Sequence, residues 1–313
     1  MRYPTKQEYP PMDIPTLEHA AVGRPLNRLG FSLFPVYLPP ANLPPIATGP
    51  GSGLVVDELP NASVPTLSVT NPTDRAILLI EGESLVGGAQ NRTLNVSVLV
   101  PAGATLKIPV TCLEQGRWGA RRAFQYGDVM APRRVRRTKQ DAVAQRMATV
   151  GAHSFERHAD QGAVWQMVDR ELGRMGVDSS SRAMSDAKAF FDRDPDRRNA
   201  VEQLVTMGPL PGQCGLVVSH GRRIVAAELF ASTDLLRPHW GAIVRSHLLE
   251  HPTADGRPSA SRALRFLGRF ANSPSERKEG LGHGIEHHVR TDRVVGQALV
   301  LPNTLIHAGA FSR

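Results

Sequence analysis

Polar side chains crowd both ends of a predicted β-hairpin in the first third of this sequence. The hairpin strands are expected over residues 94–100 and 105–110, joined by a turn that contains Pro101 and Gly103. An ordinary hairpin does not need such a concentration of acids, amides and arginines. The candidates for catalysis are Glu81, Glu83 and Glu114, and the candidates for ligand binding are Gln90, Asn91, Arg92, Gln115, Arg117 and Trp118.

These residue types suit recognition and hydrolysis of an anionic molecule. Paired carboxylates can divide the roles of general acid and general base, or can hold a divalent cation through their oxygens. Arg92 or Arg117 can donate two parallel hydrogen bonds to a phosphate or a carboxylate. The same residues also permit a purely structural interpretation, in which Arg92 and Arg117 neutralise Glu81 and Glu114 while Trp118 packs. Both interpretations stay open at this point.

A further carboxylate, Glu228, ends a strongly apolar predicted strand. Side chains alternate between the two faces of a strand, so Glu228 either joins the same pocket or faces solvent. The sequence does not decide between these two positions, and Glu228 is kept as a ligand-binding candidate.

The elements that must position these residues begin with short strands. Apolar alternation predicts strands at residues 31–38, 54–59 and 64–69, and the run AILLI at 76–80 predicts a central strand covered on both faces. Together with the hairpin, these segments predict an N-terminal antiparallel β-sandwich or barrel-like sheet.

The middle of the chain is expected to be helical and its end to return to strands. Helices are predicted over residues 139–149, 162–173, 179–191, 197–207 and 232–250. A β-hairpin is predicted at 215–219 and 224–230, a strand or short helix at 263–270, and closing strands at 285–289 and 297–307. The fold class is therefore α+β, with a Pro-rich arm over residues 1–17 and a single intertwined domain over 18–313.

Composition limits the class of protein. The chain has 313 residues, a formal net charge of +8 and two cysteines, Cys112 and Cys214, that are far apart. This cysteine usage indicates neither a disulfide framework nor a zinc knuckle. No apolar run reaches the roughly 20 residues of a membrane-spanning helix, and no signal-peptide pattern opens the chain. We therefore expect a cytoplasmic protein that does not bind membranes.

Two further patterns in the sequence have simpler explanations than the functions they suggest. Arginines crowd residues 117–139, which is compatible with nucleic-acid binding, but Phe124 and Tyr126 alone interleave with them, so a solvated or carboxylate-paired loop is favoured. The run HGIEHH at 283–288 matches a zinc-protease string that needs a helix. The surrounding glycines and the alternation that follows predict a strand instead, and we expect a surface histidine cluster.

Several of these segments resemble a bacterial family known as the ADP-ribosylglycohydrolase and rhodanese-phosphatase-superfamily-associated protein domain. The resemblance covers about residues 24–313, and its matching blocks lie at 81–103, 108–118, 161–165, 214–230 and 296–311. It implies an accessory domain associated with those two classes of enzyme, and it brings no settled activity. The family pattern usually has an aspartate where this chain has Glu228.

The sequence thus predicts a protein that binds a small anionic metabolite, such as a nucleotide, ADP-ribose or a sugar phosphate. Whether it is an enzyme stays open; if it is, we expect a hydrolase with Glu83 or Glu81 as base, with or without a divalent cation. The first alternative is a non-catalytic accessory module that binds a partner enzyme. The second alternative is nucleic-acid binding through residues 117–139.

Overall fold

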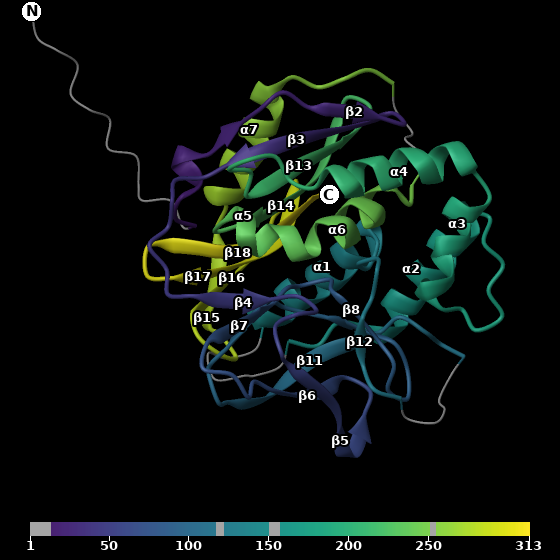
Figure 1. The fold of residues 1–313 in the computed structure, drawn as a ribbon, viewed down its shortest axis with the longest axis vertical. Helices are drawn as coiled ribbons and strands as arrows, with labels where there is room; N and C mark the ends of the chain where they lie inside the picture. Colours follow the sequence, from purple (N-terminus) through teal and green to yellow (C-terminus); the bar gives the residue numbers. More distant parts are fainter. Residues whose placement is uncertain (1–13, 117–121, 150–156, 251–254) are drawn as a thin grey trace, which may run out of the picture.

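Strands from both ends of the chain share one large antiparallel sheet in the computed structural model of the protein (Figure 1). The structure describes residues 14–116, 122–149, 157–250 and 255–313. The strands of the large sheet are β1 (Ala21–Val22), β2 (Leu26–Arg28), β3 (Phe31–Tyr37), β13 (Gly215–His220), β14 (Arg223–Phe230), β15 (Ser275–Glu279), β16 (Ile285–Arg290), β17 (Val294–Leu301) and β18 (Thr304–Ser312).

The order of this sheet explains how distant segments meet. It runs β1-β3-β13-β14-β18-β17-β16-β15, with β2 also paired to β3. The N-terminal strand β3 lies directly beside β13, with Phe34 opposite Val217. The predicted hairpin of β13 and β14 is confirmed, and Gly221 takes the positive φ of 51° that its turn requires.

The remaining strands form two smaller sheets in the lower half of Figure 1. One has the order β10-β7-β4, and the other has the order β12-β8-β9-β11-β6-β5. Their bounds are β4 (Ile46–Thr48), β5 (Val55–Ser63), β6 (Thr66–Thr70), β7 (Ala76–Leu79), β8 (Ser84–Val86), β9 (Arg92–Leu94), β10 (Val98–Val100), β11 (Thr105–Cys112) and β12 (Gln125–Tyr126). Strand β7 is central and its apolar side chains are buried, as the sequence predicted.

Helices cover the large sheet and fill the space between it and the smaller sheets (Figure 1). One face of the sheet packs on Phe266 and Phe270 of α7, and the other face packs on Trp240 and Ile243 of α6. The bounds are α1 (Arg133–Thr149), α2 (Gln161–Arg174), α3 (Ala189–Asp192), α4 (Pro195–Met207), α5 (Thr233–Leu236), α6 (Trp240–Leu248) and α7 (Ala260–Ala271), with 3₁₀ turns η1 (Leu17–His19), η2 (Met184–Lys188) and η3 (Arg237–His239). The α+β prediction, with antiparallel sheets, a helical middle and closing strands, is confirmed.

Several predicted elements differ in the structure. The hairpin predicted from residues 94–100 and 105–110 is wrong, because β10 pairs with β7 whereas β11 pairs with β6 and β9 in another sheet. Helix α1 begins at Arg133, six residues before the predicted start. The helix predicted over 232–250 is broken into α5, η3 and α6, because Pro238 lacks the N–H that a continuous helix needs. The strand predicted over 297–307 is a hairpin of β17 and β18 that turns at Asn303, whose φ is 60°. Strand β15 was not predicted, since its sequence SERKE is polar.

His287 and His288 of the HGIEHH run lie on strand β16, as the alternation predicted, but the surface position expected for them is wrong. His283 precedes the strand and is exposed. His287 and His288 are only 4% and 1% exposed. Strand β16 lies between β15 and β17 and packs against α1, so it is covered rather than at the surface. The His288 Nε2 atom lies 2.9 Å from a carboxylate oxygen of Glu286, which Arg157 also binds.

Helix α1 connects the large sheet to the smaller ones. It packs on β16 and β17, while its Val143 and Met147 join the apolar core of the smaller sheets.

None of the helices within the described ranges is long and apolar enough to cross a membrane.

The turn before β16 lies close against the backbone of strand β10. His283 N–H donates to the carbonyl of Leu99, and a Cβ atom added at Gly282 would lie 2.1 Å from that same oxygen. Gly282→Ala should therefore lower the free energy of unfolding by about 1–3 kcal/mol. Urea denaturation of the purified variant measures this change.

Gly173→Ala is the matched control, because nothing lies within 4 Å of the added methyl group. Gly173 is inside α2, where alanine is preferred over glycine by roughly 0.5–1 kcal/mol. Equal stability of the two variants would contradict the importance of the Leu99 contact.

Candidate functional site

The guanidinium of Arg136 joins two of the predicted site carboxylates in the protein interior. Its Nε and Nη2 atoms donate to Glu81 Oε2 at 3.0 and 2.8 Å, and Nη2 also donates to Glu228 Oε2 at 3.1 Å. A second contact joins Arg136 Nη1 to Glu228 Oε1. All three side chains are at most 1% exposed. The structure therefore brings Glu81 and Glu228 together, but around an arginine of α1 rather than around open space.

Lys139, one turn further along α1, balances the charge of this network. Its Nζ lies 2.7 Å from Glu81 Oε1, so two cations face two carboxylates. Burial lowers the pKa of Lys139 to about 8, and the opposing charge of Glu81 limits the fall. Burial alone would raise the pKa of Glu228, but Arg136 and His247 lower it to about 2. A carboxylate with so low a pKa is a weak base at neutral pH.

Two glycines leave the room that the Arg136 side chain occupies. A Cβ atom at Gly82, whose φ is +84°, would lie 2.2 Å from Arg136 Nε. A Cβ atom at Gly309 would lie 2.9 Å from Arg136 Nη2. These positions cannot take a larger side chain without displacing the guanidinium.

Glu83 faces a different group of residues from Glu81. Its Oε1 atom lies 3.2 Å from His239 Nδ1, and His239 Nε2 lies 2.7 Å from the hydroxyl of Thr48. Glu83 and His239 are 5% and 3% exposed. Glu83 therefore ties the loop after β7 to strand β4 and to the segment that precedes α6. Neither His239 nor Thr48 is among the residues predicted from the sequence.

The amide candidates and Glu114 form a second buried cluster near Arg92. Gln90 Nε2 donates to the carbonyl of Glu114 at 3.2 Å, and Asn91 N–H donates to Glu114 Oε2 at 3.2 Å. The thiol of Cys112 donates to Gln90 Oε1 at 3.0 Å. Burial raises the pKa of that thiol to about 11, so Cys112 is not a reactive nucleophile.

Arg92 is fully buried, yet its hydrogen bonds are incomplete. Its Nη1 donates to Gln90 Oε1 at 3.4 Å, and its Nη2 lies 3.8 Å from Glu58 Oε1. That second distance is too long for a hydrogen bond. Among the described residues, the Nε and Nη2 atoms of Arg92 have no hydrogen-bond partner. Glu58 was not found by the sequence analysis.

A cleft of about 660 Å³ lies beside this cluster. Of the site residues predicted from the sequence, Asn91 and Arg92 line it, and Ser84 lines it next to them. The cleft is not lined by Glu81, Glu83, Gln90, Glu114 or Glu228. Gln115 is exposed and accepts a hydrogen bond from Arg182, while Arg117 and Trp118 lie outside the described residues.

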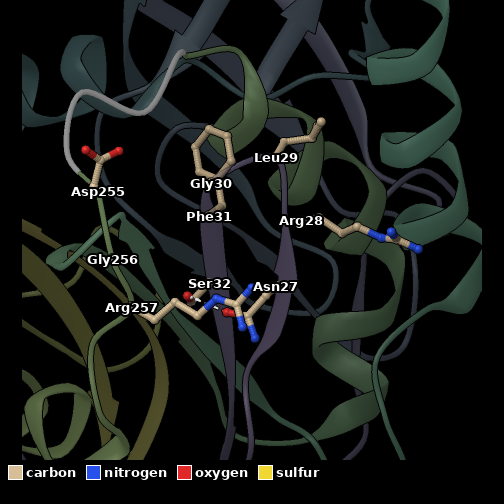
Figure 2. A pocket seen from close by; sticks show the side chains of 9 residues that line it. All are labelled: Asn27, Arg28, Leu29, Gly30, Phe31, Ser32, Asp255, Gly256 and Arg257. Carbon is tan, nitrogen blue, oxygen red and sulfur yellow. Dashed lines mark hydrogen bonds between the residues drawn. The ribbon is translucent and has the colours of Figure 1, made fainter.

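A separate cavity of about 470 Å³ lies at the turn between β2 and β3 (Figure 2). In Figure 2, Arg257 extends toward Asn27 and Ser32, and the Ser32 hydroxyl donates to Asn27 Oδ1 at 2.7 Å. The carboxylate of Asp255 is at the opposite end of the view. None of the residues predicted from the sequence lines this cavity, so it is not the predicted site.

The last part of the arginine-rich segment, residues 133–139, is the start of helix α1 rather than a loop, and residues 117–121 lie outside the described residues. Arg133 donates to Glu250 at 2.9 Å, and Arg134 lies 3.3 Å from Glu171. Together with Arg136, these arginines are committed to carboxylates, and their charges are not available to a phosphate backbone. In the ranges that the structure covers, no three His, Cys, Asp or Glu side chains are placed to hold a metal ion together.

Comparison with known proteins gives one family. Its model, described as the ARG and Rhodanese-Phosphatase-superfamily-associated Protein domain (ARPP-1), matches residues 19–311. The chain belongs to this family. The resemblance read from the sequence is thereby confirmed over nearly the same range. No curated protein and no solved structure matches the chain. The ARPP-1 description names associated superfamilies and states no reaction or ligand.

The buried histidines of the ARPP-1 domain should make its stability depend on pH. His307, bonded to Ser97 at 2.8 Å, has its pKa lowered to about 3 by burial, with Glu228 opposing the fall and Arg136 adding to it. The unfolded chain binds this proton near pH 6.5, so between pH 6.5 and 5 the unfolded state holds more protons. The free energy of unfolding should therefore fall as the pH falls, by up to about 1.4 kcal/mol per pH unit for this group.

Urea denaturation at several pH values between 5 and 6.5 measures this slope. His307→Gln should reduce the slope relative to the native protein, whereas His19→Gln, at an exposed position, should leave it unchanged. An unaltered slope in His307→Gln would show that this histidine does not carry the dependence.

Proposed function

We propose that the cleft beside β9 binds a small anionic metabolite, with Arg92 as its main contact. The observation that carries this proposal is the fully buried guanidinium whose Nε and Nη2 atoms have no hydrogen-bond partner in the described part of the chain. A buried charge with unmade hydrogen bonds is costly. Because Arg92 is 0% exposed, an anion in the cleft reaches these atoms and offers the missing acceptors only when the cleft wall opens around Arg92.

The geometry of a guanidinium suits this role. Arginine presents its donors in a planar fork that matches the oxygens of phosphate or carboxylate, and such charge-assisted bonds are stronger than neutral ones. Glu58 lies close enough to offset the charge of Arg92 partly, but too far to accept a hydrogen bond. The site therefore keeps a cation in place while leaving its donors for a ligand.

The rim of the cleft does not select anions by charge alone. Lys188 and Arg198 line it, but so do Asp128 and Asp192, and Arg245 is already bonded to Glu202 at 2.9 and 3.0 Å. Charges of both signs at the rim give little overall attraction. Affinity for an anion should therefore depend on the single buried arginine.

Phosphate-bearing metabolites fit this site and the enzyme association in the name of the ARPP-1 family. A nucleotide, ADP-ribose or a sugar phosphate each supplies an anionic group of the right geometry. Glu81 is bound to Arg136 and Glu83 is bound to His239, so the two carboxylates considered as bases are occupied. We therefore propose binding, without a hydrolytic step through these carboxylates.

A thermal-shift comparison tests the role of Arg92. AMP, ADP-ribose, ribose 5-phosphate and inorganic phosphate are each added to the native protein and to Arg92→Gln. A ligand at 100 times its Kd stabilises the folded state by about 2.7 kcal/mol, which should raise the Tm of the native protein by several degrees. The Arg92→Gln variant should show at most a small rise with the same ligand.

Arg133→Gln is the matched control. Arg133 is also buried and is bonded to Glu250, but it does not line the cleft. We expect this variant to melt earlier than the native protein yet to keep the full ligand-induced rise. A native protein that responds to none of the four compounds would contradict the proposed function, as would an Arg92→Gln variant that responds normally.

A further inference from the structure

The cleft combines polar and charged residues with apolar ones. Arg92 and Asn91 line it at the start of β9. Much of the remaining wall is apolar and comes from segments far apart in the chain, with Met130 before α1, Met184 in η2 and Phe191 in α3. A ligand that fills the cleft must therefore match two different chemistries.

The apolar wall belongs to the core of the protein rather than to loose surface side chains. Met130, Met184 and Phe191 are 2%, 7% and 6% exposed, and all three belong to the main apolar cluster. Side chains packed in this way keep their positions, because protein interiors have the density of organic crystals. The wall is thus a formed surface for an apolar group.

The residue types of this wall favour a flat ring. Methionine sulfur makes favourable contacts with aromatic rings, and phenylalanine stacks on them or meets them edge to face. The hydroxyl groups of a sugar phosphate would instead lose water against these side chains without gaining a hydrogen bond. A sugar phosphate can use the Arg92 end of the cleft but not the apolar wall.

We infer that the ligand of the cleft is a phosphate-bearing compound with a planar ring, of about the size of a mononucleotide, with its phosphate at Arg92 and its ring against Met130, Met184 and Phe191. This inference rests on the proposed binding of an anion at Arg92. The cleft volume of about 660 Å³ lies within the range of roughly 300–1,000 Å³ found for small-molecule sites. Ring and phosphate together fill both parts of the cleft.

Isothermal titration calorimetry on the intact protein tests this inference with four probes: AMP, ribose 5-phosphate, inorganic phosphate and adenosine. AMP should bind at least about tenfold more tightly than ribose 5-phosphate, because the ring adds apolar and aromatic contacts. Adenosine should bind more weakly than AMP, because it lacks the group that Arg92 holds.

Two neighbouring phenylalanines provide a matched pair of variants. Phe191→Leu removes the ring that lines the cleft, while Phe190→Leu removes the adjacent ring, which is equally buried but does not line it. The two ring centres are 5.8 Å apart. Phe191→Leu should weaken AMP binding about tenfold and leave ribose 5-phosphate binding within about twofold, whereas Phe190→Leu should change neither.

Different outcomes would overturn the inference of a planar ring and the proposed binding of an anion at Arg92. Equal affinities for AMP and ribose 5-phosphate would overturn the ring inference, and binding of an anion at Arg92 would still stand. Equal losses of AMP affinity in Phe191→Leu and Phe190→Leu would also overturn it, because the effect would then not come from the cleft wall. Binding of adenosine as tight as that of AMP, or no binding of any phosphate compound, would instead overturn the proposed function itself.

Discussion

The structure depends on the buried ion pairs of Arg136 with Glu81 and Glu228. This one guanidinium links helix α1, the loop after β7 and strand β14, which belong to three different parts of the fold. Removing one partner of such a pair leaves an uncompensated buried charge, which typically costs about 3–5 kcal/mol. The same loop continues from Glu81 into the segment that carries Asn91 and Arg92. The Arg136 network therefore holds in place the start of one of the chain segments that line the cleft.

The two fully buried arginines Arg92 and Arg136 differ in one decisive respect. Arg136 donates from all three of its nitrogens to Glu81 and Glu228, and two glycines leave the space for its side chain. Arg92 has one long hydrogen bond and no partner for Nε or Nη2 in the described structure. Saturated donors explain a structural role, whereas unsaturated donors beside a cleft support a ligand-binding role. The polar residues found in the sequence thus divide into a structural network and a candidate site.

Local sequence patterns predicted most helices and strands. They did not predict which side chains contact each other. The apolar run of β7 and the helical stripe of α2 are properties of neighbouring residues, so the sequence predicted both. The sequence also placed Glu81 and Glu83 in one site, but the positive φ of Gly82 and the pairing with Arg136 and His239 direct them to different partners. Glu81 and Arg136 are 55 residues apart in the sequence, and Glu83 and His239 are more than 150 residues apart. No local pattern records such contacts. His287 and His288 were misplaced for the same reason, because β15 and α1 cover strand β16.

A crystal structure of the protein grown with AMP would show where the nucleotide binds. We expect a phosphate oxygen to lie about 2.7–3.2 Å from Arg92 Nε or Nη2, inside the cleft lined by Asn91 and Ser84. The ion pairs of Arg136 should be the same with and without AMP. A nucleotide bound at another place, or an Arg92 that is hydrogen-bonded to Glu58 with AMP elsewhere, would contradict the account.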